Sequence, residues 1–363
     1  MERARFMQRR SGGARWGAEM EDTKSAKTWL RIFAAGYLVC CALLLVSLLT
    51  PIPYGDLTRI GRISEREFGW HEPPPPIPDA DVKTWPITES DILVIGDSFS
   101  VRYAWQSKLV GAGYKVTTTH WDNLGGVLCD DFSGWLQKSG FKGKVVIVES
   151  IERLLSDRIE KSESCRTMKH AFKPTPPPFE NPSRPAPGFQ LNWDAQLLSG
   201  WLTYKNTKEI LASDSWTNTP ERWGPLIDAR VVPDGCKQFS HRACDKLLMT
   251  AEDRVNPALT AESAKFMKRF ESTAAPYKVV WMVVPNKTSV YLQQNHADEF
   301  RAAFNPQNIG PDLFALAEQN RFKMKDLFPA NETHVSTRGY ILFGERMLEA
   351  VREVFPPPAP KTQ

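Results

Sequence analysis

The chain has 363 residues, of which 42% are apolar and 24% are charged, so it can bury a sizeable core and is not disordered throughout. Its formal net charge is +4, and the first 31 residues, with eight basic and four acidic side chains, account for all of that excess. Residues 32–363 carry equal numbers of basic and acidic side chains. This argues against a nucleic-acid-binding protein, because such a protein normally carries a basic footprint.

Residues 32–49 form an uncharged apolar run that is long enough to span a bilayer. The sequence LLTPIPYG that follows is a poor cleavage site, which disfavours a removable signal peptide; a buried core helix is the other alternative. We expect a transmembrane helix over 32–50. The basic tail of residues 1–31 would then be cytoplasmic, by the positive-inside rule. In a bacterium the body would lie in the periplasm, anchored in the inner membrane.

Four of the six cysteines lie beyond the apolar run and favour pairing in an oxidising compartment: Cys129, Cys165, Cys236 and Cys244. Cys236 and Cys244 are the natural pair because they close the short loop CKQFSHRAC, which leaves Cys129 for Cys165. Four cysteines allow three connectivities, so this pairing is one choice among three. No spacing resembles a zinc site, and we expect neither a metal nor a cofactor.

Residues 51–88 contain eight prolines and are interpreted as an extended stalk. Between residues 89 and 355, β-rich apolar runs alternate with helical stretches, which indicates an α/β domain with a largely parallel sheet. Residues 171–250 are interpreted as an irregular insertion, and 356–363 as a polar tail. The insertion carries four tryptophans that could stack on sugars or, more simply, pack in the core: Trp193, Trp201, Trp216 and Trp223.

The sharpest local feature is ILVIGDSFS, residues 92–100, in which an apolar strand ends at Gly96 and Ser98 lies on the following turn. Such a turn exposes a serine hydroxyl at the carboxyl end of a strand, where open α/β sheets bind ligands. An ordinary strand–turn–helix junction with Ser98 or Ser100 as an N-cap is the alternative. Asp97 is expected to shape the turn rather than act as a base.

A nucleophilic serine needs a base, because an unassisted hydroxyl is a poor nucleophile at neutral pH. Among the six histidines, His334 is favoured because it lies in NETHVSTRGY, on a loop before the last helix. Glu332, two residues earlier, could orient the imidazole as the third member of a triad. His120, at the end of a strand, is the rival base.

These motifs resemble the SGNH esterase and acyltransferase superfamily, and more specifically the alginate O-acetyltransferase family of periplasmic SGNH-like proteins (AlgX and AlgJ types). Four stretches carry the resemblance: LVIGDSFS (93–100), VVIVESIERLL (145–155), VVPNKTSVY (283–291) and ETHVSTRGY (332–340). The resemblance implies an SGNH-hydrolase-like three-layer sandwich. It also implies transfer of an acetyl group to an exopolysaccharide, with the donor supplied by a separate membrane acyltransferase.

The chain departs from that family in two ways. Its serine motif precedes its histidine motif, as in ordinary SGNH esterases, so the order is permuted relative to the alginate type. Glu332 replaces the family's aspartate and Val335 replaces its tryptophan, which puts the third triad member in question. A carbohydrate esterase, or a non-catalytic glycan-binding or scaffold subunit, is therefore the alternative to a transferase.

The remaining candidate residues follow from the expected acyl-transfer chemistry. Backbone N–H groups of Ser98 and of Gly125 or Gly126 would hold the oxyanion. Arg153 would orient substrate or the oxyanion loop, unless it forms a buried salt bridge. Lys287 and Tyr291 follow a strand end near the expected site and are candidates for substrate contact, with surface solvation as the alternative.

Overall fold

The computed structural model describes residues 12–183, 185–212 and 227–356. The chain divides into two compact units, one formed by Met1–Ile52 with Phe189–Thr203 and the other by Pro53–Gly188 with Tyr204–Gln363. The second unit holds the sheet and the candidate site, and it is called the body below.

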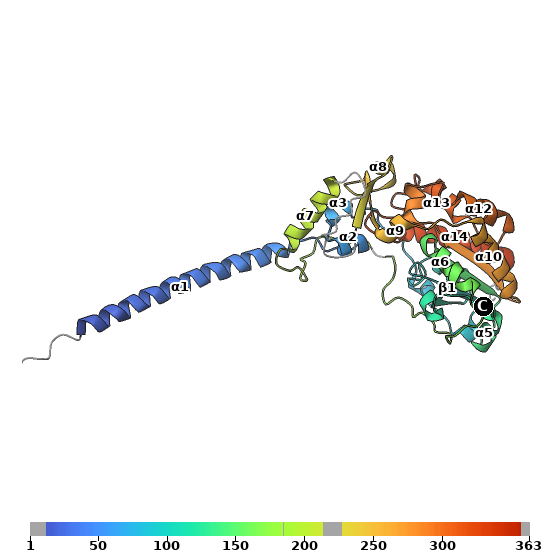
Figure 1. Ribbon diagram of the computed structural model, residues 1–363, viewed down its shortest axis with the longest axis horizontal. Helices are drawn as coiled ribbons and strands as arrows, with labels where there is room; N and C mark the ends of the chain where they lie inside the picture. The colour runs from blue at the N-terminus through green and yellow to red at the C-terminus, as the bar shows by residue number, and fades with distance from the viewer. Residues whose placement is uncertain (1–11, 184, 213–226, 357–363) are drawn as a thin grey trace, which may run out of the picture. The chain divides into compact units, whose positions relative to one another are not determined.

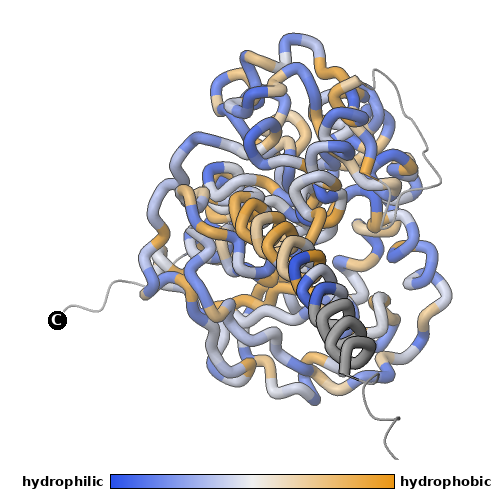
Figure 2. The backbone as a smooth tube through the Cα atoms, turned by 90° about the vertical axis from the view of Figure 1, so that its left-hand side faces the viewer, coloured by the Kyte–Doolittle hydropathy of each residue, from blue (hydrophilic) through white to orange (hydrophobic). Residues whose placement is uncertain are grey.

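The first unit contains the long helix α1, Gly12–Ser47, which is the blue helix of Figure 1. Over Lys24–Ser47 its mean hydropathy reaches 2.1, and the helix is long and apolar enough there to cross a membrane. Figure 2 shows the same stretch as a band of apolar residues, with hydrophilic residues before it. Residues 1–11 of the expected cytoplasmic tail lie outside the described residues.

The body is built on a four-stranded sheet in the order β2-β1-β3-β6, and each neighbouring pair is parallel. Its strands are β1 (Ile92–Gly96), β2 (Val116–His120), β3 (Val145–Ile151) and β6 (Lys278–Val284). They are rich in Val, Ile and Thr and are buried almost throughout, as expected for parallel strands covered on both faces. The expected α/β class with a largely parallel sheet is confirmed.

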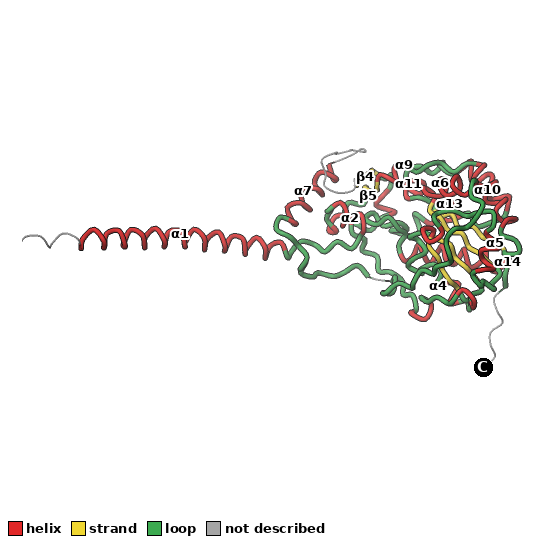
Figure 3. Tube along the Cα trace, turned by 60° about the horizontal axis from the view of Figure 1, so that its bottom comes forward, coloured by secondary structure: helices red, strands yellow, loops and turns green. Residues whose placement is uncertain are grey.

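Helices pack on both faces of this sheet, and Figure 3 shows the yellow strands among them. The alternation of side chains along β1 separates two cores: Ile92 and Val94 enter one, and Leu93 and Ile95 enter the other. The first core is completed by α4 (Ser107–Gly111), α11 (Lys287–Tyr291), α13 (Leu313–Asn320) and α14 (Thr337–Val354). The second contains α5 (Phe132–Lys138), α6 (Glu152–Glu163), α10 (Ala261–Thr273) and α12 (Asp298–Phe304).

The proposed stalk is wrong for most of its length. Leu57, Ile63 and Phe68 are buried in the same core as β1. Leu57 belongs to the short helix α2 (Asp56–Gly61), Phe68 belongs to α3 (Glu65–Phe68), and Ile63 lies between the two helices. The prolines suggested an extended spacer, but the apolar residues between them bury surface against the body, which an exposed stalk would not do. The segment also contains the 3₁₀ turns Asp79–Asp81 and Ile87–Glu89.

The expected irregular insertion over 171–250 divides into three parts with different structures. Its proline-rich first part belongs to the body, residues 189–203 belong to the first unit, and the rest carries an antiparallel hairpin. The hairpin comprises β4 (Ile227–Val231) and β5 (Lys246–Thr250), and it is accompanied by α7 (Ser199–Ala212), α8 (Gly235–Gln238) and α9 (Ala251–Val255). Core packing is wrong for Trp193 and Trp201, which are exposed, whereas Trp216 and Trp223 lie outside the described residues.

Both expected disulfides are confirmed. Cys129 pairs with Cys165 and Cys236 pairs with Cys244, with a Cα–Cα separation of 4.6 Å in each case. The first links the loop after β2 to the end of α6, and the second closes the loop before β5. Such bonds are compatible with an oxidising compartment. Of the predicted tail, residues 357–363 lie outside the described part of the chain.

Candidate active site

The turn that carries Ser98 is built tightly beneath the hydroxyl. β1 ends at Gly96, where a Cβ atom would come within 2.3 Å of Ser100 Oγ and 2.7 Å of Glu149 Oε2, so only glycine fits. Ser98 itself is exposed, whereas its neighbours Asp97 and Phe99 are buried. The sequence therefore folds so that one hydroxyl faces outward from an otherwise packed turn.

Asp97 holds this turn, as expected. Its carboxylate accepts from Phe99 N–H (3.1 Å), Ile151 N–H (2.9 Å) and Arg158 Nη1 (2.9 Å). Burial opposes its ionisation, but the Arg158 charge and these hydrogen bonds together lower the pKa of Asp97. With both oxygens engaged away from Ser98, Asp97 acts as a structural group.

Glu149 is a second buried carboxyl group under the turn, and the sequence had not singled it out. Its Oε2 accepts from Asp97 N–H at 2.9 Å and from Ser100 Oγ at 2.7 Å. Burial and the nearby Asp97 charge raise the pKa of Glu149 well above its ordinary value. It supports the turn from below and does not contact the outward-facing hydroxyl.

His334 lies 2.9 Å from Ser98, measured from Nε2 to Oγ, although 236 positions separate the two residues. Its other ring nitrogen, Nδ1, lies 2.8 Å from Glu332 Oε1. Ser336 caps the helix α14 by accepting from Gly339 N–H, which ends the loop just after the histidine. The buried ring of Phe99 packs 4.8 Å from the imidazole and restricts its orientation. Serine, histidine and glutamate thus form a continuous hydrogen-bonded relay.

The rival base His120 is engaged elsewhere. Its Nδ1 accepts from Asp122 N–H at 3.1 Å and caps the 3₁₀ helix Trp121–Leu124. That is a local structural role, at the end of β2. His334 is the histidine that the tertiary structure brings to the serine.

Asp56 is a site residue that sequence reasoning missed. Its Oδ2 lies 3.7 Å from His334 Nδ1, its carboxylate accepts from Thr333 N–H at 2.8 Å, and it also accepts from the Thr333 hydroxyl. Asp56 belongs to the segment interpreted as a stalk, 276 positions before Glu332, so nothing local in the sequence pointed to it. The imidazole therefore faces two carboxylates, with Glu332 the nearer.

The two carboxyl groups differ in their acidity. Burial, followed by repulsion from Glu332, raises the pKa of Asp56. Burial also acts against ionised Glu332, but its hydrogen bond and attraction to His334 outweigh this and lower its pKa. The relay needs Glu332 in its ionised form, and the lowered pKa of Glu332 favours that form.

Asp56, Glu332 and His334 also offer ligand atoms within 4.8 Å of one another, which makes them the one cluster of metal-ligand type in the described part of the chain. Glu332 and His334 hydrogen bond directly to each other, and Asp56 holds Thr333. A cation there would have to displace the contact that orients the imidazole.

Lys287 and Tyr291 do not reach toward the serine, which corrects the expectation of substrate contact. Lys287 is fully buried, and its ammonium donates to backbone carbonyls of Leu248 (2.9 Å), Pro329 (3.2 Å), Ala330 (3.5 Å) and Glu332 (2.7 Å). Tyr291 is buried and bonds to the backbone of Phe328. Both residues clamp the loop that presents Glu332 and His334.

Arg153 forms the salt bridge that was the alternative to substrate contact. Its guanidinium lies 3.3 Å from Asp253 and donates to Asn286 Oδ1 at 2.9 Å, and its side chain is 10% exposed. Gly125 and Gly126 are also not free as oxyanion donors. Their N–H groups donate within their own turn, to Asp122 O (3.1 Å) and Trp121 O (2.9 Å). Ser98 N–H, in contrast, has no hydrogen-bond partner among the described residues.

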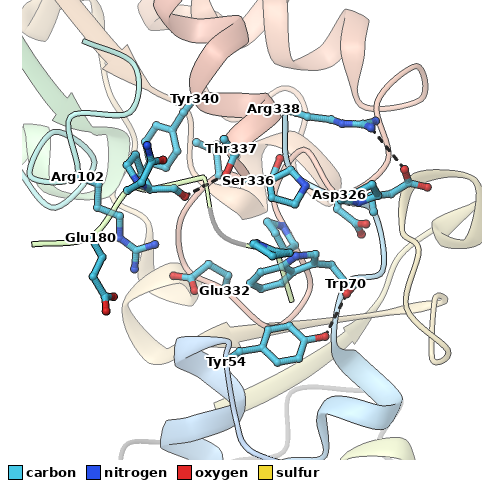
Figure 4. Close-up of a pocket in the computed structure, with 18 of the residues that line it drawn as sticks. Tyr54, Trp70, Arg102, Glu180, Asp326, Glu332, Ser336, Thr337, Arg338 and Tyr340 are labelled. Carbon is cyan, nitrogen blue, oxygen red and sulfur yellow. Dashed lines mark hydrogen bonds and ion pairs between the residues drawn. The ribbon is translucent and has the colours of Figure 1, made fainter. Parts of the chain in front are cut away.

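A cavity of about 610 Å³ within the body is lined by Glu332, whereas Ser98 and His334 are not among its lining residues (Figure 4). One wall comes from residues 53–88, which the sequence had suggested were a stalk, and includes Tyr54 and Trp70. Another comes from the proline-rich segment around Pro178–Pro187. That segment is tied down where Asn181 donates to Ile77 O at 2.8 Å. The charged residues of the lining have both signs: Glu72, Arg102, Glu180, Lys325, Asp326, Glu332 and Arg338.

No protein-family model, curated protein or solved structure matches this chain. Its function is therefore inferred from the geometry of the relay and the cavity beside it.

Proposed function

We propose that this protein is a membrane-anchored periplasmic O-acyltransferase, most simply an O-acetyltransferase, which modifies an exopolysaccharide or other cell-surface glycan through a serine acyl-enzyme. The body would be an SGNH-like domain related to the alginate O-acetyltransferases. The observation that carries this proposal is the relay from Ser98 through His334 to Glu332, with distances of 2.9 and 2.8 Å.

In the first half-reaction His334 Nε2 takes the Ser98 proton while Oγ bonds to the acyl carbon of the donor. Glu332 stabilises the imidazolium and holds its tautomer. The oxyanion would form beside the Ser98 N–H, which has no hydrogen-bond partner in the described part of the chain and can donate to it. Collapse breaks the bond to the leaving group, which departs with the proton from His334, and leaves the acyl group on Ser98.

In the second half-reaction a sugar hydroxyl gives its proton to His334 and attacks the acyl carbon, and Ser98 recovers its proton as it leaves. The cavity supports a carbohydrate acceptor because it combines aromatic surface from Tyr54 and Trp70 with hydrogen-bonding groups. Its four acidic and three basic side chains favour an acceptor of low charge over a polyanion.

The apolar helix of the first unit and the disulfides of the body support the expected setting. The apolar stretch of α1 and the two disulfides suit a periplasmic body anchored in the inner membrane. Acetyl-CoA is cytoplasmic, so the donor would be an acyl group delivered by a separate membrane acyltransferase. Transfer to water in place of sugar would make the protein an esterase.

The test uses the full chain in detergent, with hydrolysis of a chromogenic acetyl ester followed by absorbance. We expect turnover by the natural protein and a fall of about 10³-fold or more in Ser98→Ala, because the nucleophile is lost. Ser164→Ala is the matched control, since Ser164 is exposed at the end of α6 and lies outside the relay.

Equal rates for Ser98→Ala and the natural protein would overturn the nucleophile assignment. Absence of turnover above buffer in every protein would favour the non-catalytic glycan-binding alternative. Adding an oligosaccharide acceptor and weighing the products by mass spectrometry distinguishes a transferase, which adds an acetyl group to the sugar, from an esterase, which does not.

A further inference from the structure

The segment Phe189–Thr203, in the same unit as α1, has an unusual surface. Its fifteen residues contain a single charged side chain, Asp194. Six of its apolar side chains are exposed: Phe189 (84%), Leu191 (40%), Trp193 (77%), Leu197 (45%), Leu198 (55%) and Trp201 (57%). Such a dense apolar surface is rare on a protein face that meets only water and marks an interaction site.

This segment is attached to the end of the apolar helix. Asn192 N–H donates to Leu48 O at 2.8 Å, just beyond the last residue of α1. Gly200 packs so closely beside Thr50 that a Cβ atom at position 200 would lie 3.2 Å from Thr50 Oγ1. The run of apolar residues that could cross a membrane ends at Ser47. The segment is therefore held at the level where α1 would leave the hydrocarbon.

We propose that Phe189–Thr203 lies at the interface between the bilayer and water, on the side of the membrane where α1 ends. Its exposed Trp, Phe and Leu side chains would insert among lipid headgroups and upper acyl chains. Trp is favoured at that depth because its ring is apolar and its N–H remains able to reach polar groups. The near absence of charge suits insertion, because buried charges are costly there. The occupant of this surface is lipid, and a glycan or a second copy of the chain is not required.

The experiment reconstitutes the full chain in phosphatidylcholine and phosphatidylglycerol vesicles after Cys40→Ala and Cys41→Ala remove the two cysteines outside the disulfides. A single cysteine is then introduced by Trp193→Cys or Leu198→Cys and labelled with an environment-sensitive fluorophore. Lys142→Cys, at an exposed position of the body, is the matched control. Emission is compared in vesicles with and without brominated acyl chains.

We expect blue-shifted emission at positions 193 and 198, with about half of it or more lost to brominated lipid, and little quenching at position 142. Phe189→Cys provides a third exposed position if one labelled protein assembles poorly. Quenching at these positions no greater than at 142 would overturn the proposal. A blue shift without lipid quenching, as burial against a glycan or a second copy would produce, would also overturn it.

Discussion

At the scale of single residues, the site depends on how two carboxylates share one imidazole. Glu332 is one methylene longer than the aspartate expected from the resemblance, yet its Oε1 reaches His334 Nδ1 at 2.8 Å. Asp56 approaches the same nitrogen from another segment at 3.7 Å and anchors Thr333 between them. The extra length of Glu332 is thus accommodated, and Asp56 supports the loop.

This difference predicts unequal effects of removing each charge. Glu332→Gln keeps the size but loses the group that fixes the imidazole tautomer, and we expect acyl-transfer kcat to fall by about 10² to 10⁴-fold. Asp56→Asn should lower kcat only about tenfold, because Asp56 does not hydrogen bond directly to His334. Both are measured by ester turnover, with circular dichroism as the check on folding. A larger loss in Asp56→Asn than in Glu332→Gln would make Asp56 the third member of the triad.

His241 makes a separate residue-scale prediction about acid stability. It is buried, its Nε2 lies 2.8 Å from Ala243 O and 3.0 Å from Lys246 O, and burial lowers its pKa from 6.5 to about 4. Between these two values the unfolded chain binds a proton that the folded chain does not, so the His241 contribution to stability falls as the pH drops from 6.5 toward 4.

At pH 5 this contribution to the free energy of unfolding is reduced by about 2 kcal/mol relative to neutral pH. We therefore expect the thermal midpoint of the natural protein to fall more steeply between pH 7 and pH 5 than that of His241→Gln, which retains a donor but does not titrate. Parallel slopes for the two proteins would show that His241 is not the acid-sensitive group.

At the scale of elements, one buried lysine connects the hairpin to the loop that carries Glu332 and His334. Lys287 begins α11 and donates to Leu248 O on β5 and to the carbonyls of Pro329, Ala330 and Glu332. Leu248 N–H donates in turn to Ala330 O at 3.1 Å. Burial lowers the pKa of Lys287 to about 8, so it remains protonated at neutral pH. The β4–β5 hairpin therefore supports the loop that carries His334.

Lys287→Met should loosen that loop, because it leaves several buried carbonyls without their donor. We expect a loss of about 2 kcal/mol or more in the free energy of unfolding and about a tenfold fall in kcat for the acetyl ester. Lys142→Met, at an exposed position, is the control and should change neither. Natural stability and turnover in Lys287→Met would show that the clamp is dispensable.

At the scale of the whole molecule, the boundary between the two units lies at residues 52–53, much earlier than the prolines suggested. Residues 53–68 contribute Leu57, Ile63 and Phe68 to the core and Asp56 to the site. Each fully buried side chain of this kind stabilises the fold by about 1.5–3 kcal/mol. Their sum is comparable to the total stability of an ordinary domain, about 5–15 kcal/mol.

Two truncations test this boundary. We expect a chain starting at Pro53 to fold and to retain ester turnover, because every residue of the relay and its supports is present. A chain starting at Gly69 should fail to fold cooperatively, as measured by thermal unfolding and by solubility. A folded and active chain from Gly69 would restore the interpretation of the segment as a spacer.

The sequence by itself determined the features that depend on neighbouring residues. The apolar run predicted the long helix, the alternating strands predicted a parallel sheet, and the local motifs around Ser98 and His334 identified the two residues that meet at 2.9 Å. Such signals are readable because backbone propensity and turn chemistry act over a few positions.

Only the tertiary structure decided which distant groups surround that pair. Asp56 reaches the site across 276 positions, Lys287 turns its charge onto backbone carbonyls, and Arg153 pairs with Asp253. No local sequence pattern indicates these contacts. A buried charged or polar group needs a partner, and the partners available to it are set by the residues that the fold packs around it. For the same reason, prolines that predict an extended chain could not reveal that the apolar residues between them enter the core.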